Sequence, residues 1–263
     1  MILKHTAKTM RLACALGLTA AGLSTATADL RYKAKGTEFD LTGKLVGDQV
    51  GTRLAMGPKG GYLVWQDNAT DAFGLGISAL RVDAAGNPVG APVRINSLLE
   101  GDQENPQVGV LPGGGAVFAW EGGASGFHRV HYRVANAQGV FLADDLLATG
   151  PESGEQTEPS LTVLKNGNSV LAWTDYLADG GVKGVSARVI AADGTAVAAP
   201  FRLNEFTLGN QHKSRLAALP NGGFAAVWVS DQQQDAKSLD VVIRIFSATG
   251  QVLSGEVVVN APG

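Results

Sequence analysis

The chain has little cysteine, little charge and few aromatic side chains. Cys14 is the one cysteine among 263 residues, and it lies in an N-terminal segment that we expect to be removed. The mature chain therefore has no disulfide, no thiolate metal site and no thiol nucleophile. Charged residues make up 17% of the chain and the formal net charge is −3. No basic surface is available for a phosphate backbone, so nucleic acid is excluded as a partner.

The first 28 residues have the pattern of an export signal. Lys4, Lys8 and Arg11 precede an apolar run at 12–23, and 26–28 supplies small residues before a cleavage site. The run has only about 12 residues, whereas a membrane span needs about 20, so we expect no membrane span in the mature chain. We predict cleavage after residue 28 and a secreted or periplasmic protein. Of the 21 basic residues three lie in this segment, with none of the 24 acidic ones, so cleavage changes the net charge from −3 to −6.

Glycine is the residue that the chain has in excess. It contains 35 glycines and 10 prolines, while 45% of its residues are hydrophobic. A disordered chain would have more charge and a helical chain less glycine, so the composition favours a turn-rich globular β protein. No stretch of the mature chain shows the spacing of three and four residues that apolar side chains have in an amphipathic helix. We therefore expect strands and no helix.

A period of about 54 residues runs through the mature chain. In each copy a Gly-polar-Gln triplet comes first, an apolar strand ending in tryptophan follows, and an arginine and a turn glycine come next. We interpret the tryptophans as core between blades and the arginines as scaffold, with each guanidinium bonded to an acid or a carbonyl. The columns are Gln49, Gln103, Gln156 and Gln211; Trp65, Trp120, Trp173 and Trp228; Arg81, Arg133, Arg188 and Arg244; and Gly86, Gly139, Gly194 and Gly250.

Each copy has four short predicted strands separated by turns, which is typical of a β-propeller blade. The strands are apolar without strict alternation, as expected when a blade buries both faces against its neighbours. The predicted fold class is all-β, a β-propeller-like array of four four-stranded blades with an extra N-terminal strand. A single domain at 29–263 would contain these repeats, at about 45–98, 99–150, 151–206 and 207–260.

The number of fourth strands leaves the closure of the array open. Residues 36–42 repeat the pattern of residues 90–96, so the mature chain begins with a lone fourth strand, and it ends with another at 255–260. Three arrangements remain: a closed four-bladed ring with a spare edge strand, an open arc, and a homodimer in which two arcs complete a larger ring.

The repeated phrases extend over residues 36–260. They read Gly-x-Gln-x-x-Pro, then Leu-Pro-x-Gly-Gly-Phe-x-x-x-Trp, then Arg-x-x-x-Ala-x-Gly, and finally Phe/Val-x-Val/Leu-Asn. This pattern resembles the tandem propeller-type repeats of bacterial secreted and cell-surface proteins. The resemblance implies propeller-like blades. It implies no catalytic residue, because the members are mostly uncharacterised modules of surface proteins.

Three of the loops that follow the tryptophans contain two aspartates four residues apart. Paired carboxylates beside backbone carbonyls suit a hard cation such as calcium. The same spacing is typical of turns in which a carboxylate accepts backbone N–H bonds, and both interpretations remain open. The predicted metal ligands are Asp67, Asp71, Asp175, Asp179, Asp231 and Asp235.

The long polar loops of successive blades are expected on one face, where a binding site would lie. Aromatic and amide side chains in these loops could stack on a sugar and hydrogen-bond to it. The predicted ligand-binding residues are Phe73, Phe127, Tyr176, Gln232 and Gln234.

Two functions fit this sequence, and no catalytic residue is predicted for either. The leading hypothesis is an exported, non-enzymatic interaction module that recognises a carbohydrate or a surface protein. The alternative is a glycan-acting hydrolase of propeller fold, in which carboxylates of the loop face act as acid and base. A carboxylate pair repeated in every blade favours binding or structure, whereas a pair that occurs once favours an enzyme.

Overall fold

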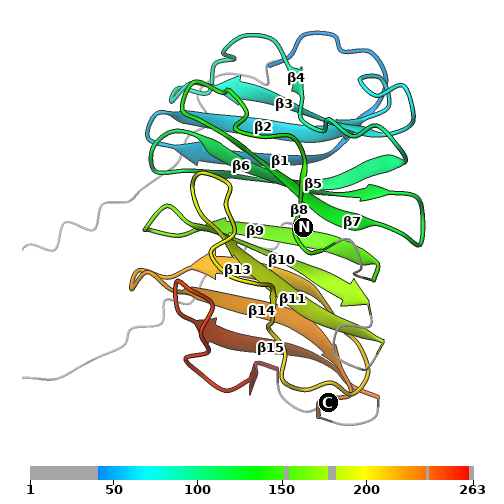
Figure 1. Ribbon diagram of the computed structural model, residues 1–263, viewed down its shortest axis with the longest axis vertical. Coiled ribbons are helices and arrows are strands. Elements are labelled where there is room, and N and C mark those ends of the chain that lie inside the picture. Colours follow the sequence, from blue (N-terminus) through cyan, green and yellow to red (C-terminus); the bar gives the residue numbers. More distant parts are fainter. Residues whose placement is uncertain (1–40, 151–153, 177–181, 235–236, 261–263) are drawn as a thin grey trace, which may run out of the picture. The chain divides into compact units, whose positions relative to one another are not determined.

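The computed structural model describes residues 41–150, 154–176, 182–234 and 237–260. These residues form four four-stranded antiparallel sheets, each made of four strands that are consecutive in sequence (Figure 1). The predicted all-β array of four four-stranded blades is thereby confirmed. Residues 36–40 of the extra N-terminal strand and the whole export signal lie outside the described residues. Among the described residues, no helix is long and apolar enough to cross a membrane.

The strands of each sheet follow one another in chain order, and the fourth strand of each is short. Sheet one contains β1 (Gln49–Gly57), β2 (Gly60–Asp67), β3 (Gly76–Val82) and β4 (Val93–Arg94). Sheet two contains β5 (Asp102–Val110), β6 (Ala116–Gly123), β7 (Arg129–Ala135) and β8 (Leu146–Leu147). Sheet three contains β9 (Gln156–Val163), β10 (Ser169–Tyr176), β11 (Lys183–Ile190) and β12 (Phe201–Arg202). Sheet four contains β13 (Gln211–Ala218), β14 (Phe224–Asp231), β15 (Leu239–Phe246) and β16 (Val257–Val258).

The recurring turn glycine between the third and fourth strands has a backbone reason. Gly139 and Gly194 have φ angles of 83° and 89°, in the left-handed region that a side chain disfavours. Gly86 and Gly250 both have φ 86° at the same place in their own blades. The glycine column of the sequence therefore marks one turn conformation that is used four times.

The core lies between successive sheets. We call the side of a sheet toward the following blade its forward face and the side toward the preceding blade its backward face. Val64 on the forward face of the first blade packs with Phe118 and Trp120 on the backward face of the second. Equivalent clusters join the second blade to the third around Trp173 and the third blade to the fourth around Trp228. These three tryptophans are thus inter-blade core, as the sequence predicts, whereas Trp65 belongs to none of the described clusters.

Three of the four repeated arginines donate hydrogen bonds to the preceding blade. Nη1 of Arg133, Arg188 and Arg244 donates to a carbonyl of the preceding blade, on Ile95, Ala148 and Leu203, at 2.7, 2.9 and 3.1 Å. Each of these arginines lies two residues after the strand partner of its blade tryptophan.

Arg81 is not equivalent to these three, which corrects the predicted arginine column. The strand partner of Trp65 is Ser78, so Arg81 lies three residues after it and Leu80 takes the column position. Successive side chains of a strand point to opposite faces. Arg81 is therefore on the forward face of the first blade, opposite Tyr62, whereas the other arginines are on backward faces.

The forward face of the fourth blade has no covering blade among the described residues. Buried and half-buried residues alternate strictly along β14, while β10 of the third blade is buried almost throughout. Val241 and Leu239 on this face are 42% and 69% exposed. None of the described hydrophobic clusters joins the fourth sheet to the first. The described residues thus do not form the closed four-bladed ring, and the open arc and the dimer stay predictions.

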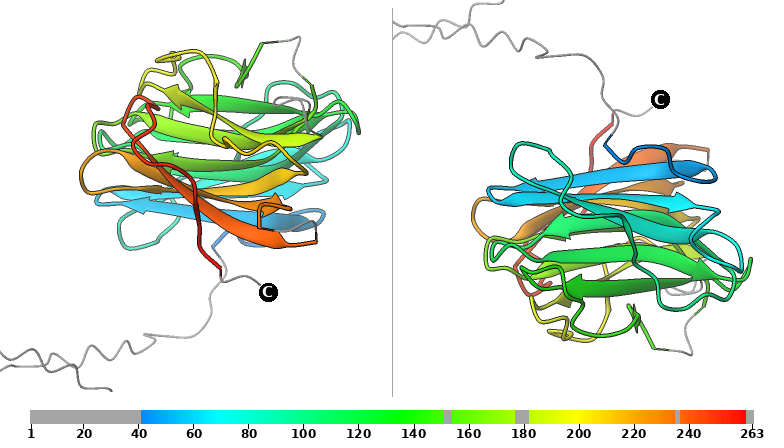
Figure 2. Two further views of the ribbon diagram at one scale, coloured as in Figure 1. Left: turned by 90° about the horizontal axis from the view of Figure 1, so that it is seen from below. Right: turned by 90° about the horizontal axis from the view of Figure 1, so that it is seen from above.

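The first strands of neighbouring sheets contact each other in chain order, β1 with β5, β5 with β9 and β9 with β13. Figure 2 shows the strands of the blades as successive layers. Each first strand has a break in its pairing register with the second strand, which is a β-bulge. The bulges contain residues with φ between 52° and 65°, namely Gly51, Asn105, Glu158 and Lys213. Bulges re-aim side chains and are frequent beside active sites.

Candidate functional site

The residue before each bulge faces the residue that follows the blade tryptophan, and these two residues form a cross-strand pair in every blade. Because the first strands are neighbours, the four pairs follow one another along the inner side of the array. Only the second blade has two carboxylates at this position. The pairs are Val50 with Gln66, Glu104 with Glu121, Thr157 with Thr174, and His212 with Val229.

The Glu104–Glu121 pair is electrostatically unfavourable. Directly opposed residues have Cβ atoms about 4.5–5.5 Å apart, and like charges at this separation destabilise a sheet. Glu121 is also only 5% exposed. Burial is the main cause that raises its pKa, and the carboxylate of Glu104 raises it further. A local conflict that the fold tolerates at one of four equivalent positions is expected where function, and not stability, selects the residues.

Hydrogen bonds to both carboxylate oxygens hold Glu121 in place. Oε2 of Glu121 accepts the backbone N–H of Glu158 at 2.7 Å, and Oε1 accepts the side-chain amide of Asn105. Oε2 of Glu158 in turn accepts the hydroxyl of Thr174 at 2.8 Å and the backbone N–H of Lys213 at 3.1 Å. The bulges thus donate N–H groups to the preceding blade. The side chains of this network are fixed before any ligand arrives, which catalysis requires.

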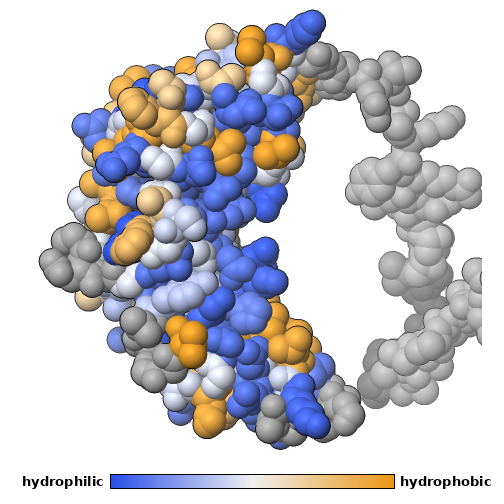
Figure 3. Space-filling view, turned by 90° about the vertical axis from the view of Figure 1, so that its right-hand side faces the viewer, coloured by the Kyte–Doolittle hydropathy of each residue, from blue (hydrophilic) through white to orange (hydrophobic). Residues whose placement is uncertain are grey.

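The chemistry available here is that of two carboxyl groups in different environments. The buried Glu121, with its raised pKa, retains a proton to a higher pH than a solvated glutamate does. Glu104 is half-buried and faces it across the strand pair. A buried carboxyl group that retains its proton beside a second carboxyl group is the kind of arrangement used in glycoside hydrolysis. Figure 3 shows hydrophilic side chains gathered around a hollow in the surface of the described residues.

The three predicted aromatic ligand-binding residues lie on three different blades. Phe73 and Phe127 are 68% and 71% exposed. Phe127 borders a cleft of about 230 Å³ together with Trp120 and His131. The ring of Tyr176 lies 4.7 Å from the Lys183 amine. No contact joins these three aromatic residues to one another within the described residues, so a shared sugar-stacking platform stays a prediction.

The two predicted glutamines have local roles. Gln234 donates through Nε2 to Oδ1 of Asp240 at 2.6 Å and through its backbone N–H to Oδ2 at 3.0 Å. The Ser238 hydroxyl, with Asn260 and Gln234, lowers the pKa of Asp240 to about 2. Gln232 adopts φ 63° at the start of the same loop. Gln234 therefore stabilises this loop, and its role toward a ligand is untested.

The described aspartates of the predicted metal set accept protein hydrogen bonds. Asp67 accepts the N–H groups of Ala69 and Thr70 and, at 2.6 Å, the hydroxyl of Ser78. Burial alone would raise the pKa of Asp67, but these hydrogen bonds lower it.

The remaining aspartates are bound in the same way, each by a donor of its own blade. Asp71 accepts the amide of Asn96 at 2.9 Å, Asp175 the indole N–H of Trp173 at 3.0 Å, and Asp231 the amide of Asn210 at 2.7 Å. Asp179 and Asp235 lie outside the described residues. Within the described part of the chain, no three His, Cys, Asp or Glu side chains could hold a metal ion together. Calcium binding stays a prediction.

Glu104 and Glu121 are not among the site residues predicted from the sequence, although this cross-strand pair differs from blade to blade. The available signal was the residue after each tryptophan, which is glutamate in the second copy but Gln66, Thr174 or Val229 in the others. Its partner could not be found from spacing, because the bulge shifts the strand register by an amount that the sequence does not reveal.

The fold is shared with solved glycoside hydrolases. An alpha-L-arabinofuranosidase from Fusarium graminearum, in complex with an iminosugar inhibitor, matches at 13% identity over 76% of this chain and 63% of its own, with a TM-score of 0.51. A putative glycoside hydrolase from Parabacteroides distasonis matches at 10% identity over 80% of this chain and 72% of its own, with a TM-score of 0.50. An endo-arabinase from Bacteroides thetaiotaomicron matches at 15% identity over 83% and 85%, with a TM-score of 0.47. No family model matches the chain, and no curated protein matches its sequence.

These matches correct the leading hypothesis of a non-enzymatic interaction module. The propeller fold of the described residues is that of proteins named as glycoside hydrolases, which favours the alternative. The physical reason for the error lies in the aspartate pairs. Their repetition suggested a binding surface, but the described ones accept hydrogen bonds from their own loops, while the carboxylate pair that occurs once escaped notice.

Proposed function

We propose that this protein is a glycoside hydrolase of propeller fold, in which Glu121 is the proton donor and Glu104 the second carboxylate. The observation that carries the proposal is the cross-strand pairing of these two residues at a position where no other blade has a carboxylate. A carboxylate pair that occurs once on a repeated scaffold favours an enzyme, whereas a pair repeated in every blade favours binding or structure.

The environments of the two residues assign their roles. A proton donor must be protonated at the working pH, and burial raises the pKa of Glu121 in that direction. The half-buried Glu104 then serves as the carboxylate that attacks the anomeric carbon or activates water. Asn105 and Glu158 orient Glu121 through the hydrogen bonds to its two oxygens. We also propose that the chain is exported and cleaved after residue 28, which would bring the enzyme to an extracellular or periplasmic glycan.

Arabinose-containing glycans are the first substrates to test, because one neighbour of this fold is named an alpha-L-arabinofuranosidase. We expect the mature protein to release reducing sugar from arabinan. Glu104→Gln and Glu121→Gln are expected to lower kcat at least about 100-fold, the usual contribution of a general acid or base. Thr157→Val changes the equivalent position of the third blade and is the matched control, which should leave kcat unchanged.

Two results would contradict the proposal. One is a folded wild-type protein that hydrolyses neither arabinan nor any xylose-, galactose- or glucose-based glycan of a broad panel. The other is hydrolysis that Glu104→Gln and Thr157→Val reduce equally, because the pair of the second blade would then have no special role.

A further inference from the structure

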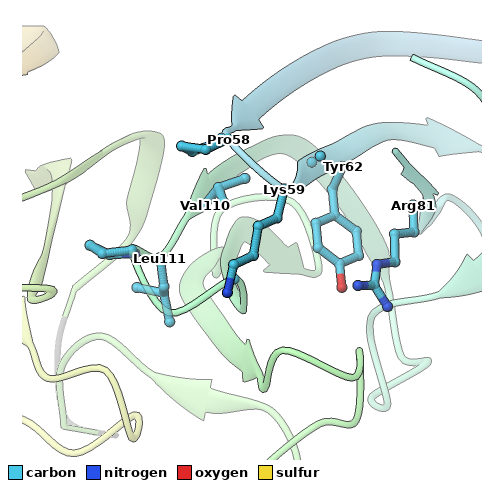
Figure 4. A pocket seen from close by; sticks show the side chains of 11 residues that line it. Pro58, Lys59, Tyr62, Arg81, Val110 and Leu111 are labelled. Carbon is cyan, nitrogen blue, oxygen red and sulfur yellow. The ribbon is translucent and has the colours of Figure 1, made fainter. Parts of the chain in front are cut away.

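A cavity of about 140 Å³ lies between the first two blades. Pro58 and Lys59, in the turn from β1 to β2, and Val110 and Leu111, at the end of β5, line it together with Tyr62 and Arg81 (Figure 4). The Glu104–Glu121 pair lies near the start of β5 and the end of β6, whereas this cavity lies at the opposite end of these strands. The cavity is therefore distinct from the proposed catalytic pair.

The shift of Arg81 by one residue places a cation in this cavity. A one-residue shift in a strand moves a side chain to the other face of the sheet. Arg81 consequently points toward the second blade and not away from it, and its Nη2 donates to the carbonyl of Ala137 at 3.1 Å. The cross-strand pairs at this register in the other blades are uncharged, namely Val117 with Val134, Val170 with Val189, and Ala225 with Ile245.

Tyr62 lines the same cavity, and its buried hydroxyl has no hydrogen-bond partner in the described residues. Tyr62 is 6% exposed. The hydroxyl of Tyr132, in contrast, donates to the carbonyl of Gly194 at 3.0 Å. Figure 4 shows the hydroxyl of Tyr62 beside the guanidinium of Arg81. Burial raises the pKa of Tyr62, so the hydroxyl keeps its proton and remains a donor.

The cavity combines positive charge with apolar walls. Its lining contains Lys59 and Arg81 but no acidic residue. Among the ion pairs of the described residues, none involves either of these cations. Pro58, Val110 and Leu111 supply apolar surface. Small-molecule sites typically have such walls with a few convergent polar groups.

We propose that this cavity binds a sugar acid through its carboxylate, held by Arg81 and Lys59. The planar guanidinium matches a carboxylate with two parallel N–H donors. Lys59 contributes charge from the rim of the cavity. The apolar walls face the ring of the sugar. The site would retain an acidic glycan at a distance from the catalytic pair, and it does not depend on the proposed hydrolase activity.

Isothermal titration calorimetry of the mature protein tests this inference with D-glucuronate as the probe. D-Glucose has the same ring without the carboxylate, and acetate has the carboxylate without the ring. We expect glucuronate to bind at least about tenfold more tightly than either, because charge-assisted hydrogen bonds and the ring contact both contribute. Arg81→Gln should weaken glucuronate binding at least about tenfold.

Lys165→Gln is the matched control, since Lys165 is an exposed lysine in the corresponding turn of the third blade, and it should leave binding unchanged. Arg81 is only half-buried, so we expect the Arg81→Gln variant to fold. The inference is overturned if the folded wild-type protein does not bind glucuronate, if Arg81→Gln binds it like the wild type, or if acetate binds as tightly as glucuronate. None of these results bears on Glu104 or Glu121, so the two proposals can fail separately.

Discussion

Replacing Arg244 by methionine should destabilise the protein far more than the same change at Arg81. Arg244 is 9% exposed and donates to three acceptors in two blades. They are the carbonyls of Leu203 and Ser254, both at 3.1 Å, and Oε2 of Glu205 at 2.8 Å. Arg81 has one described hydrogen bond, at 3.1 Å. The comparison therefore sets an arginine with three acceptors, two of them in the preceding blade, against one with a single described acceptor in the following blade.

The expected magnitude follows from what each variant leaves without a donor. Methionine keeps most of the apolar stem of Arg244, so the loss is polar. A buried acceptor left unsatisfied costs about 1–3 kcal/mol, and the carbonyl of Leu203 becomes such an acceptor. The Glu205 side chain is 70% exposed, so its ion pair adds at most about 1 kcal/mol. We expect Arg244→Met to lose about 2–4 kcal/mol and Arg81→Met about 1 kcal/mol or less.

Urea unfolding followed by tryptophan fluorescence measures the difference, because all four tryptophans are buried. For a protein of this size, each kcal/mol lost should lower Tm by about 2–4 °C in a parallel thermal scan. The reasoning is refuted if Arg81→Met loses as much as Arg244→Met, or if Arg244→Met loses less than about 1 kcal/mol at an unchanged m-value.

Further variants test individual parts of the structure. Ile190 is fully buried, so Ile190→Ala should cost about 2–5 kcal/mol in urea unfolding. Ile245→Ala, on the uncovered face of the fourth blade, should cost clearly less, and an equal cost would show that something covers this face. Because the fold raises the pKa of Glu121, ionisation opposes folding, and the stability of the wild type relative to Glu121→Gln should rise as pH falls through the folded pKa. A fall over this range contradicts the raised pKa. The fold lowers the pKa of Asp67, so the ionised Asp67 side chain stabilises the folded state. The wild type should therefore be more stable than Asp67→Asn at neutral pH, and this difference should vanish as pH falls through the folded pKa. A difference in Tm that stays constant with pH contradicts this. If calcium binds the aspartate loops, it should raise Tm relative to a chelator, and an unchanged Tm removes the calcium proposal.

The repeated features of the fold could be predicted from the sequence. Trp120 and Trp173 recur at a nearly constant spacing, and the structure buries both between blades. The position of Arg81 could not be derived in the same way, because a one-residue register is decided by strand pairing. A hint was present, since Arg81 precedes its turn glycine by five residues, whereas Arg133 precedes its own by six.

The candidate site is harder to predict for a physical reason. A repeat search detects what the copies share, whereas a catalytic residue on a repeated scaffold is what one copy has alone. Glu104 faces Glu121 only because a bulge shifts the register of β5 against β6, and no local propensity specifies this shift. The four bulges share one backbone geometry. Once the strand pairing is known, the side chains at equivalent positions of the four blades can therefore be compared directly.

The most direct test of the catalytic pair compares two substrates that differ in leaving group. Arabinan needs protonation of the leaving oxygen, whereas para-nitrophenyl α-L-arabinofuranoside, whose leaving group is a weak base, does not. If Glu121 is the proton donor and Glu104 the second carboxylate, Glu121→Gln should lose activity on arabinan and keep much of it on the nitrophenyl substrate, while Glu104→Gln should lose both. Equal activity of both variants and the wild type on the two substrates would contradict the assignment.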